Sequence, residues 1–451
     1  MAAKHILSKT TAIGSKDTPD SRSYKKPQEG QPKPAKPGIC ILLENYPAPF
    51  DRRVWQEARA LNEAGYSVSI ISPKALGLNA SHETIDGINI YRHRIREAQR
   101  PLGYLFEYLW ALICEFLLAL KIYARRPFRV IHACNPPDTS FLIGAFFKLL
   151  GVRFVFDHHD LCPELFEDKF GKRGFLYRLV RLFEYLTYRM ADVSIATNQS
   201  YRDIAIGRGG MAPDRVFIVR SCLDLSKVRQ RVPKPELKNG KANLVVYLGV
   251  MGPQDGVDLL LDSIALIVHG DKRQDTQFVL IGSGTETPRL KTLATQKGLD
   301  PFVKFTGRIP DEELEEYLST ADVAVAPDPA NGLNDKSTMN KILHYMAYGL
   351  PIVQYALTEG RRSAEDAALY AHNDDPKEFA AQITRLLDSE RLRKQLGNRG
   401  RQRIQQELNW DMEKQELLRA YQAALDPDSR IAAVRRETTC AQDADAPRCD
   451  L

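Results

Sequence analysis

The chain has 451 residues, 43% hydrophobic and 27% charged, which is the composition of a globular protein with a large core. Its net charge of +6 is uneven: residues 1–220 hold 32 Lys and Arg against 22 Asp and Glu, whereas residues 221–451 hold 31 against 35. The basic half favours an acidic partner, either an anionic lipid surface or a phosphorylated acceptor. No nucleic-acid motif is apparent, so we expect no nucleic acid among the partners.

The seven cysteines are scattered, without a Cys-x-x-Cys pair. This pattern predicts a reducing compartment without structural zinc, and therefore a cytoplasmic location. Residues 1–37 are polar and rich in Lys, Ser and Pro, with no signal peptide. We expect a disordered leader there and a disordered tail over residues 426–451.

Residues 38–225 alternate short apolar runs with helical patterns. A strand at 39–43 precedes a loop with two prolines, and a helix then begins near Asp51, a good N-cap, and ends at Gly65. This spacing predicts a doubly wound α/β domain with six or seven strands. The remaining expected strands are 66–72, 87–91, 129–133, 153–156, 193–197 and 216–219.

Two segments of this domain are unusually apolar. Residues 102–124 are interrupted by Glu107, Glu115 and Lys121, so a helix buried against the sheet is the expected structure. A helix on the bilayer surface and a transmembrane helix are the alternatives. Residues 175–190 form a basic amphipathic pattern, which fits both a core helix with a solvated edge and a helix on an anionic membrane.

The strand–helix pattern restarts after a polar, basic linker at residues 226–242. Residues 243–408 predict a second doubly wound domain, and residues 409–425 a helix that packs back towards the first. Ligands of such sheets bind beyond the carboxyl ends of the strands. Two domains of this kind therefore predict a deep cleft between them.

Two loops at carboxyl ends carry the densest chemistry. The first is Asp157-His158-His159-Asp160, followed by Glu164; it suits either a functional site or a satisfied structural histidine, and its spacing does not suggest zinc. The second precedes a helix expected to begin near Ser337 or Thr338, beside Lys336 and Lys341. Such a helix start suits a phosphate, although an ordinary capped helix with solvated lysines has the same pattern.

Several motifs together resemble a known family, the retaining glycosyltransferases of family 4 with the GT-B fold. The resemblance covers roughly residues 38–425, and part of it is similar to bacterial surface-polysaccharide transferases. The motifs are DRRVWQEARAL, HACNPPD, VFDHHDLCPE, YLGVMGPQDGVDLLL, VLIGSGTETPRL, FTGRIPDEEL and NKILHYMAYGLPIV.

The resemblance implies site residues in both domains. His159 and Asp160 match the catalytic His-Asp, whose histidine would stabilise the developing oxocarbenium-like centre. The implied donor-binding residues are Gly307, Arg308, Lys336, Ser337, Thr338, Met339, Lys341, His344, Arg361 and Arg362. The implied acceptor-side residues are Asp51, Arg52, Arg53, Asn135, Asp138 and Glu164. No metal and no cofactor beyond a UDP- or GDP-type nucleotide sugar is implied.

The chain departs from the family pattern at three places. Lys336 and His344 stand where the family commonly has two acidic residues. The loop 249–256 lacks the Arg and Lys that clamp the donor diphosphate, so Lys336, Lys341, Arg361 and Arg362 are the expected replacements. The acceptor-side glycine-rich loop is replaced by Pro47-Ala48-Pro49-Phe50.

The predicted function is metal-independent, retaining transfer of a sugar to a lipid-linked or polysaccharide-precursor acceptor. The expected location is the inner face of the cytoplasmic membrane, as a peripheral protein. Two alternatives remain: a non-catalytic nucleotide-sugar-binding or scaffold subunit on the same fold, and a sugar-nucleotide epimerase. The donor sugar, its base and the acceptor linkage are not specified by the sequence.

Overall fold

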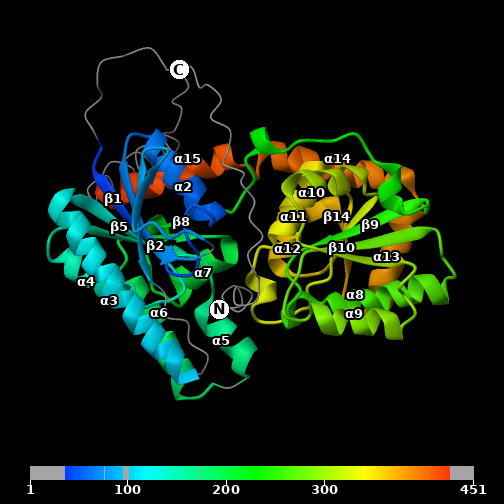
Figure 1. The fold of residues 1–451 in the computed structure, drawn as a ribbon, viewed down its shortest axis with the longest axis horizontal. Coiled ribbons are helices and arrows are strands. Elements are labelled where there is room, and N and C mark those ends of the chain that lie inside the picture. Colours follow the sequence, from blue (N-terminus) through cyan, green and yellow to red (C-terminus); the bar gives the residue numbers. More distant parts are fainter. Residues whose placement is uncertain (1–35, 76, 95–100, 172, 427–451) are drawn as a thin grey trace, which may run out of the picture.

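The computed structural model describes residues 36–75, 77–94, 101–171 and 173–426. The predicted leader and tail therefore lie almost entirely outside the described residues. Two α/β domains lie side by side and are joined by the segment after β8 and by the helices at the C-terminal end (Figure 1). The predicted pair of doubly wound domains is confirmed.

The first domain is built on an eight-stranded sheet of order β3-β4-β2-β1-β5-β6-β7-β8, in which only the β3–β4 pairing is antiparallel. Its strands are β1 (Gly38–Leu42), β2 (Ser67–Lys74), β3 (His82–Ile85), β4 (Ile88–Arg94), β5 (Phe128–Cys134), β6 (Arg153–His158), β7 (Val193–Ala196) and β8 (Val216–Ile218). Its helices are α2 (Arg52–Glu63), α3 (Pro101–Arg125), α4 (Phe141–Lys148), α5 (Cys162–Phe170), α6 (Phe175–Met190) and α7 (Gln199–Gly207).

The second domain is built on a six-stranded parallel sheet of order β11-β10-β9-β12-β13-β14. Its strands are β9 (Asn243–Leu248), β10 (Thr276–Ile281), β11 (Val303–Gly307), β12 (Val323–Ala326), β13 (Ile352–Tyr355) and β14 (Ala368–Ala371). Its helices are α8 (Val257–Ala265), α9 (Thr287–Gln296), α10 (Asp311–Thr320), α11 (Asn340–Tyr348), α12 (Thr358–Ala364), α13 (Pro376–Leu387) and α14 (Glu390–Gln406).

The last described helix, α15 (Trp410–Leu425), returns to the first domain. Its residues Leu417, Ala420, Tyr421 and Ala424 are buried in the same cluster as the apolar residues of β1, β2 and α2. Apolar residues three and four apart put one face of α15 against the sheet. A helix from the far end of the chain thereby becomes part of the core of the first domain.

Three sequence predictions need correction. The first sheet has eight strands rather than six or seven, because the polar segment His82–Ile85 pairs as an antiparallel edge strand that lacks an apolar signal. Asp157 and His158 belong to β6 rather than to the loop after it. The expected helix at Ser337 or Thr338 begins at Asn340, because a 3₁₀ turn over Asn334–Lys336 and an extended Met339 precede it.

The helix α3 uses one face only against the sheet. Ala119 and Ile122 are fully buried, whereas Leu109, Ile113 and Leu117, spaced four residues apart, are about half exposed. Among the described residues, no helix combines the length and the apolar character that a membrane crossing requires.

Candidate functional site

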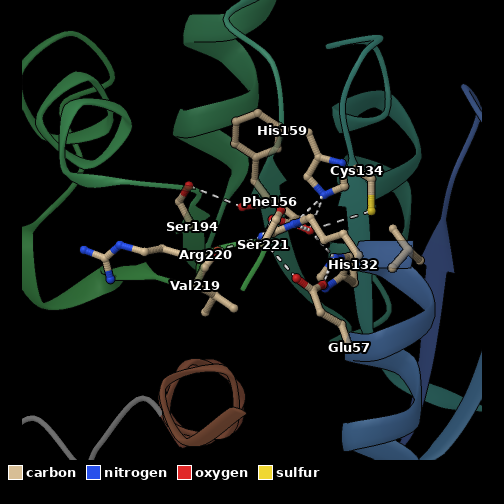
Figure 2. Close-up of polar contacts among 12 residues, drawn as sticks. Glu57, His132, Cys134, Phe156, His159, Ser194, Val219, Arg220 and Ser221 are labelled. Carbon is tan, nitrogen blue, oxygen red and sulfur yellow. Dashed lines mark hydrogen bonds and ion pairs between the residues drawn. The ribbon is translucent and has the colours of Figure 1, made fainter. Parts of the chain in front are cut away.

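The candidate site of the first domain is built on the end of β6. Side chains alternate along a strand, so Asp157 and His159 lie on the same face. His159 Nε2 is 2.5 Å from Asp157 Oδ2 (Figure 2). The sequence prediction joined His159 with Asp160, but the structure pairs the imidazole with Asp157.

The short contact fixes the tautomer that we assign to His159. Two atoms 2.5 Å apart with lone pairs facing each other would repel, so a proton lies between them and Nε2–H donates to Asp157. The Arg53 Nε–H, 3.1 Å from His159 Nε2 and 3.4 Å from Asp157 Oδ2, then donates to the carboxylate. The second ring nitrogen, Nδ1, remains for a ligand.

The Asp157 carboxylate is surrounded by donors. Arg53 NH2 donates to Oδ1 at 2.8 Å, and His132 Nε2 lies 3.3 Å from Oδ2. Burial opposes the charged form, but the charges of Arg53 and His159 outweigh it and hold the pKa of Asp157 well below its usual range. For His159, burial also opposes the charge, and the attraction of Asp157 outweighs it and raises the pKa. The pair is therefore a carboxylate and a readily protonated imidazole.

A second carboxylate lies behind this pair. Glu57 Oε1 is 3.0 Å from Arg53 NH2, and Glu57 Oε2 is 3.7 Å from His132 Nε2. Burial raises the pKa of Glu57 to about 8, against the opposing charge of Arg53 and with a further rise from Asp157. One guanidinium thus serves two carboxyl groups whose pKa values shift in opposite directions, that of Glu57 upward and that of Asp157 downward.

Asn135 shapes the backbone that presents His159. Its Oδ1 accepts from the backbone N–H groups of His159, at 2.7 Å, and Asp160, at 3.2 Å. Its Nδ2 donates to Asp138 Oδ1 and to the Asp160 carbonyl. Burial raises the pKa of Asp138 to about 6 and also raises the pKa of Asp160. Asn135 and Asp138, expected on the acceptor side, therefore support the loop that carries His159.

One trio in this network has the ligand types of a metal site. Possible ligand atoms of His132, Cys134 and Asp157 lie within 4.8 Å of one another, the only such group among the described residues. The guanidinium of Arg53 already bonds to the same carboxylate at 2.8 Å. A metal ion there would face that positive charge at close range, so these residues fit the guanidinium rather than a metal.

The candidate site of the second domain is made of loops that pack backbone against backbone. A Cβ on Gly282, whose φ is +125°, would stand 1.9 Å from the Gly249 carbonyl oxygen. A Cβ on Gly256, with φ of +63°, would stand 2.0 Å from the Pro327 carbonyl oxygen. Glycine is required at these two positions because no other residue fits both the conformation and the space.

Each of the four expected phosphate-binding cations already has a partner. Lys341 is buried and donates to both oxygens of Asp328, at 2.7 and 3.0 Å. Arg361 lies 4.4 Å over the ring of Tyr370 and contacts His372. These contacts hold both side chains within the second domain, so either would have to leave its partner to bind a diphosphate.

The other two cations reach the first domain. Lys336 Nζ is 3.3 Å from Glu164 Oε1, and Glu164 also bonds to Arg208 at 2.7 Å. Arg362 bonds to Glu359, whose Oε1 accepts from the backbone N–H and the hydroxyl of Ser200. Glu164, expected on the acceptor side, therefore lies against the candidate donor residue Lys336.

Residues 336–339 form the junction before α11, and Asn198 of the first domain bonds to it across the cleft. Its Nδ2 donates to the Lys336 carbonyl at 2.8 Å and to Thr338 Oγ1 at 3.1 Å. Ser337 donates to the Leu333 carbonyl, and Met339 takes the N-cap position of α11 without a side-chain bond. The predicted donor segment thus lies directly against the first domain.

A cavity of about 880 Å³ lies between the domains beside this junction. Its walls come from α2, the segment after β8, α10, α11 and the start of α15, and include Arg52, Arg53, Asp311 and His344. Arg52 and Asp311 bridge the two domains at 3.0 Å. Burial, with a smaller contribution from the charge of Arg52, lowers the pKa of His344 to about 4, so this imidazole is neutral.

The remaining predicted residues take simple positions. Asp51 caps α2 by accepting from the Val54 N–H at 3.0 Å. Gly307 ends β11, where its carbonyl accepts from the Gly282 N–H, and Arg308 is exposed after it. Asp51 thus caps α2 and also lines the cavity between the domains, whereas Gly307 and Arg308 lie at the carboxyl edge of the second sheet.

Sequence reasoning missed the partners of His159. Period-two alternation could have indicated Asp157, since a strand that continues through His158 puts residues 157 and 159 on one face. Glu57 lies four residues after Arg53 on the same helix, which is a weaker signal. Neither His132 nor Tyr421 has a local signal, because their contacts join segments far apart in the chain.

Comparison with protein families gives two matches. Residues 51–221 match the model described as "Glycosyl transferase 4-like domain", and residues 242–389 match "Glycosyl transferases group 1". The two matches correspond to the two domains and together cover more than half of the chain. Each contains its domain's candidate site.

Curated relatives agree with this assignment. The chain is 30% identical over 246 residues to a D-inositol 3-phosphate glycosyltransferase of Thermomonospora curvata, covering 50% of this chain and 55% of the relative. It is 28% identical over 260 residues to an MMP alpha-(1->4)-mannosyltransferase of Mycolicibacterium hassiacum, covering 57% of this chain and 59% of the relative. The chain spans about half the length of the curated relatives it matches.

Solved structures share the fold. A sucrose-phosphate synthase of Thermosynechococcus elongatus superposes with a TM-score of 0.67 at 20% identity, over 86% of this chain and 98% of that one. The Anabaena protein HepE, solved with UDP, superposes with a TM-score of 0.65 at 14% identity, over 85% of this chain and 100% of that one. With both domains matched in order and the fold shared, the chain belongs to the family-4-like glycosyltransferases of the GT-B fold.

Proposed function

We propose that the chain transfers a sugar from a nucleotide-sugar donor to a hydroxyl group of a saccharide or lipid-linked acceptor, with retention and without a metal ion. The observation that supports it most is the His159–Asp157 pair, held 2.5 Å apart where β6 ends, beside the domain boundary. In the reaction the bond between the sugar carbon and the diphosphate oxygen breaks, and a bond to the acceptor oxygen forms. The acceptor proton passes to the leaving diphosphate.

His159 is the residue that we propose to face the sugar. Asp157 occupies Nε2, so Nδ1 is the atom available to the donor sugar or its hydroxyls. In its neutral form the imidazole offers an acceptor there, and in its protonated form a donor. Transfer generates positive charge on the sugar and negative charge on the diphosphate, so an orienting carboxylate behind the imidazole favours the transition state electrostatically.

Lys336 is the proposed cation for the diphosphate. Of the four candidates it lies at the junction before α11 and contacts the first domain. Binding of the diphosphate would replace Glu164 as its partner, and Glu164 would keep its bond to Arg208. Because Lys336 would exchange the Glu164 carboxylate for the diphosphate, donor binding would change the contact between the two domains.

The same ion pairs favour a second candidate function, a nucleotide-sugar-binding or scaffold subunit. Lys341 is committed to Asp328, and Asp255 stands in the loop where the resemblance implies a diphosphate clamp. Burial raises the pKa of Asp255 to about 6, against the charge of Lys341. An acidic residue in this loop opposes the negative charge that builds up on the leaving diphosphate during transfer, which favours a subunit that does not catalyse transfer. No observation favours the epimerase alternative.

The first domain, the proposed acceptor domain, has an exposed surface that suits contact with a membrane. Exposed large apolar side chains gather on α3, α4 and α6, three helices on one side of the first sheet (Figure 1). They include Leu117, Leu142, Leu149, Phe175, Leu176 and Leu182. Arg178 and Arg189 are exposed on α6 among them. Apolar side chains with flanking arginines fit an anionic bilayer, where a lipid-linked acceptor resides.

Vesicle sedimentation tests this surface. A Phe175→Ser/Leu176→Ser variant is expected to bind vesicles of anionic phospholipid several-fold more weakly than the wild type, because two large apolar side chains no longer insert. Val232→Ser is the matched control, since Val232 is 84% exposed but lies in the inter-domain segment. Equal binding by all three proteins would contradict the membrane proposal.

Donor binding and transfer are tested in one series. Thermal unfolding is measured with a panel of nucleotides and nucleotide sugars, and a ligand at about a hundred times its dissociation constant should add about 2.7 kcal/mol. A selective shift names the donor, which is then offered with lipid-linked sugars to the wild type and to His159→Ala. A shift with transfer that His159→Ala abolishes supports the enzyme. A shift without any transfer supports the scaffold subunit, and no shift contradicts both.

A further inference from the structure

We propose that Tyr421 and His132 are positioning residues that hold Asp157, and through it His159, in place for transfer, so that the C-terminal helix α15 is part of the active site. The inference rests on the proposed function for its catalytic meaning, but its structural content can be measured separately. It concerns side chains that neither the family match nor the relatives assign. Its basis is one continuous chain of hydrogen bonds.

The chain of bonds starts on α15. The Tyr421 hydroxyl and His132 Nδ1 are 2.7 Å apart, and His132 Nε2 is 3.3 Å from Asp157 Oδ2. Asp157 Oδ2 in turn receives the Nε2–H of His159. The donors and acceptors follow a consistent order: the phenol donates to Nδ1 of His132, its Nε2–H donates to the carboxylate, and the carboxylate accepts from His159. Each hydrogen-bond donor in this series therefore faces an acceptor.

Three of the four residues in this series of hydrogen bonds are fully buried. Tyr421, His132 and Asp157 each have no exposed surface, and the Tyr421 and His132 rings are nearly parallel, at 14° with centroids 6.0 Å apart. The neighbours of Tyr421 on α15 are Leu417, Ala420 and Ala424, an apolar setting in which a phenylalanine would satisfy packing alone. A buried hydroxyl in such a place is favourable only if it is bonded, and here its partner is His132.

The groups that face the His159–Asp157 pair come from several elements. They are Asp51, Arg53 and Glu57 around α2, His132 and Cys134 on β5, His158 and Asp160 at the end of β6, Ser221 after β8, and Tyr421 on α15. Tyr421 is an uncharged group that contacts the pair through His132 rather than directly. Its removal therefore changes the orientation of His132 without removing a charge from the network.

Loss of the Tyr421 hydroxyl is expected to change the hydrogen bond from His132 to Asp157. Without a donor at Nδ1, the Nε2–H of His132 is polarised less and becomes a weaker donor to the carboxylate, and the imidazole ring loses the contact that orients it. Asp157 is then stabilised less by His132 and attracts the His159 proton more strongly. The pKa of His159 is expected to rise, and the imidazole is less firmly oriented. A role confined to packing would change neither property.

The position of α15 explains why such a contact serves the enzyme. The preceding helix α14 packs on α11, where Gly397 approaches the Gly349 carbonyl and Gly400 approaches Met346. α15 then crosses to the first domain (Figure 1). One continuous segment therefore touches the donor helix at one end and, through Tyr421 and His132, the His159–Asp157 pair at the other.

The test uses Tyr421→Phe in the full chain, with Tyr66→Phe as the matched control. Tyr66 is buried and its ring lies 5.8 Å from that of Tyr421, but it is outside the chain of bonds. Histidine NMR of isotope-labelled protein follows the titration of His159, identified with His159→Ala. We expect the pKa of His159 to rise by roughly half a unit in Tyr421→Phe, and not to change in Tyr66→Phe.

Kinetics give the second readout. In Tyr421→Phe, kcat for transfer is expected to fall about tenfold while KM for the donor changes less than about twofold, because orientation rather than binding is lost. His132→Gln removes the same link and should shift His159 in the same direction if Tyr421→Phe does not fold. An unchanged His159 titration in the folded variants, or a kcat equal to that of Tyr66→Phe, overturns the proposal. If the wild type transfers no sugar, the proposed function fails while the titration still decides the positioning.

Discussion

The two sheets differ in structure at the edges that border the cleft, where their parallel strands have their carboxyl ends. The edge of the first domain is a connected polar network in which one arginine, two histidines and two carboxyl groups are buried together. The edge of the second domain is made of glycine loops in van der Waals contact, and its cations are held by acidic or aromatic partners. The buried groups of the first edge bond to one another, whereas the proposed binding of a diphosphate to the second edge would require Lys336 to leave Glu164.

This difference indicates where the two halves of the reaction are prepared. A preorganised pair at His159 needs no rearrangement during transfer, which is the most effective way to stabilise developing charge. A lysine held by Glu164 becomes available to a diphosphate only when the ion pair opens. Substitutions in the first domain should therefore change kcat, and those at Lys336 should change donor affinity.

The largest effect is expected from Asp157→Asn. Without the carboxylate, His159 loses the attraction that raises its pKa and the acceptor that fixes its tautomer, so kcat should fall by roughly 100-fold or more. Asp160→Asn is the control and should lose less than about tenfold, because its carboxylate does not bond the imidazole. Equal losses, measured at matched thermal stability, would return the catalytic role to Asp160.

Gly282→Ala tests the packing of the second edge. The new Cβ would stand 1.9 Å from the Gly249 carbonyl in a left-handed conformation, so the free energy of unfolding should fall by about 2–4 kcal/mol. Gly270→Ala, which has no heavy atom within 4 Å of its Cβ, should change it by less than about 0.5 kcal/mol. Denaturant unfolding measures both, and a tolerant Gly282 would mean that the donor loops are loosely packed.

Lys336→Ala should raise the dissociation constant of the donor about tenfold, the value of one charge-assisted contact of roughly 1.4 kcal/mol. Glu164→Gln should lower it by about twofold to fivefold, because a partially exposed competing ion pair is worth at most about 1 kcal/mol. Arg361→Ala is the control, since Arg361 contacts Tyr370 and His372. Calorimetric titration would contradict the exchange if Glu164→Gln weakened binding.

The last prediction concerns the buried His158 of β6, which accepts a hydrogen bond from the Tyr188 hydroxyl at 2.7 Å. Burial, helped by the charge of Arg208, lowers the pKa of His158 from its usual 6.5 to about 3. Below pH 6.5 the unfolded chain therefore binds a proton that the folded chain does not, and stability falls until about pH 3. In His158→Gln the dependence of unfolding free energy on pH should be shallower by about 1.4 kcal/mol per unit.

That difference is measured by denaturant unfolding at a series of pH values. A variant whose slope equals that of the wild type would show that His158 takes up its proton in the folded state. The measurement would also separate the two histidines of this motif, since the pKa of His159 is raised and that of its neighbour is lowered.

Much of the fold could be predicted because its signals are local. The helix after Asp51 and the helix Phe175–Met190 follow from capping and from apolar spacing, and both lie where expected. The polar strand His82–Ile85 could not be predicted, because an exposed edge strand has no apolar pattern. The helix start at Asn340 was misplaced since Ser337 and Thr338, which resemble caps, use their hydroxyl groups elsewhere.

The sequence by itself determined two α/β domains, a polar loop at the end of each critical strand and the position of His159. These depend on periodicities of two and 3.6 residues and on loop chemistry, which act over a few neighbouring residues. Only the tertiary structure decided that His159 pairs with Asp157, that Lys336 meets Glu164, and that Tyr421 reaches His132 from 289 positions away. Those contacts depend on how distant segments pack, and no local pattern encodes which buried charge will find which partner.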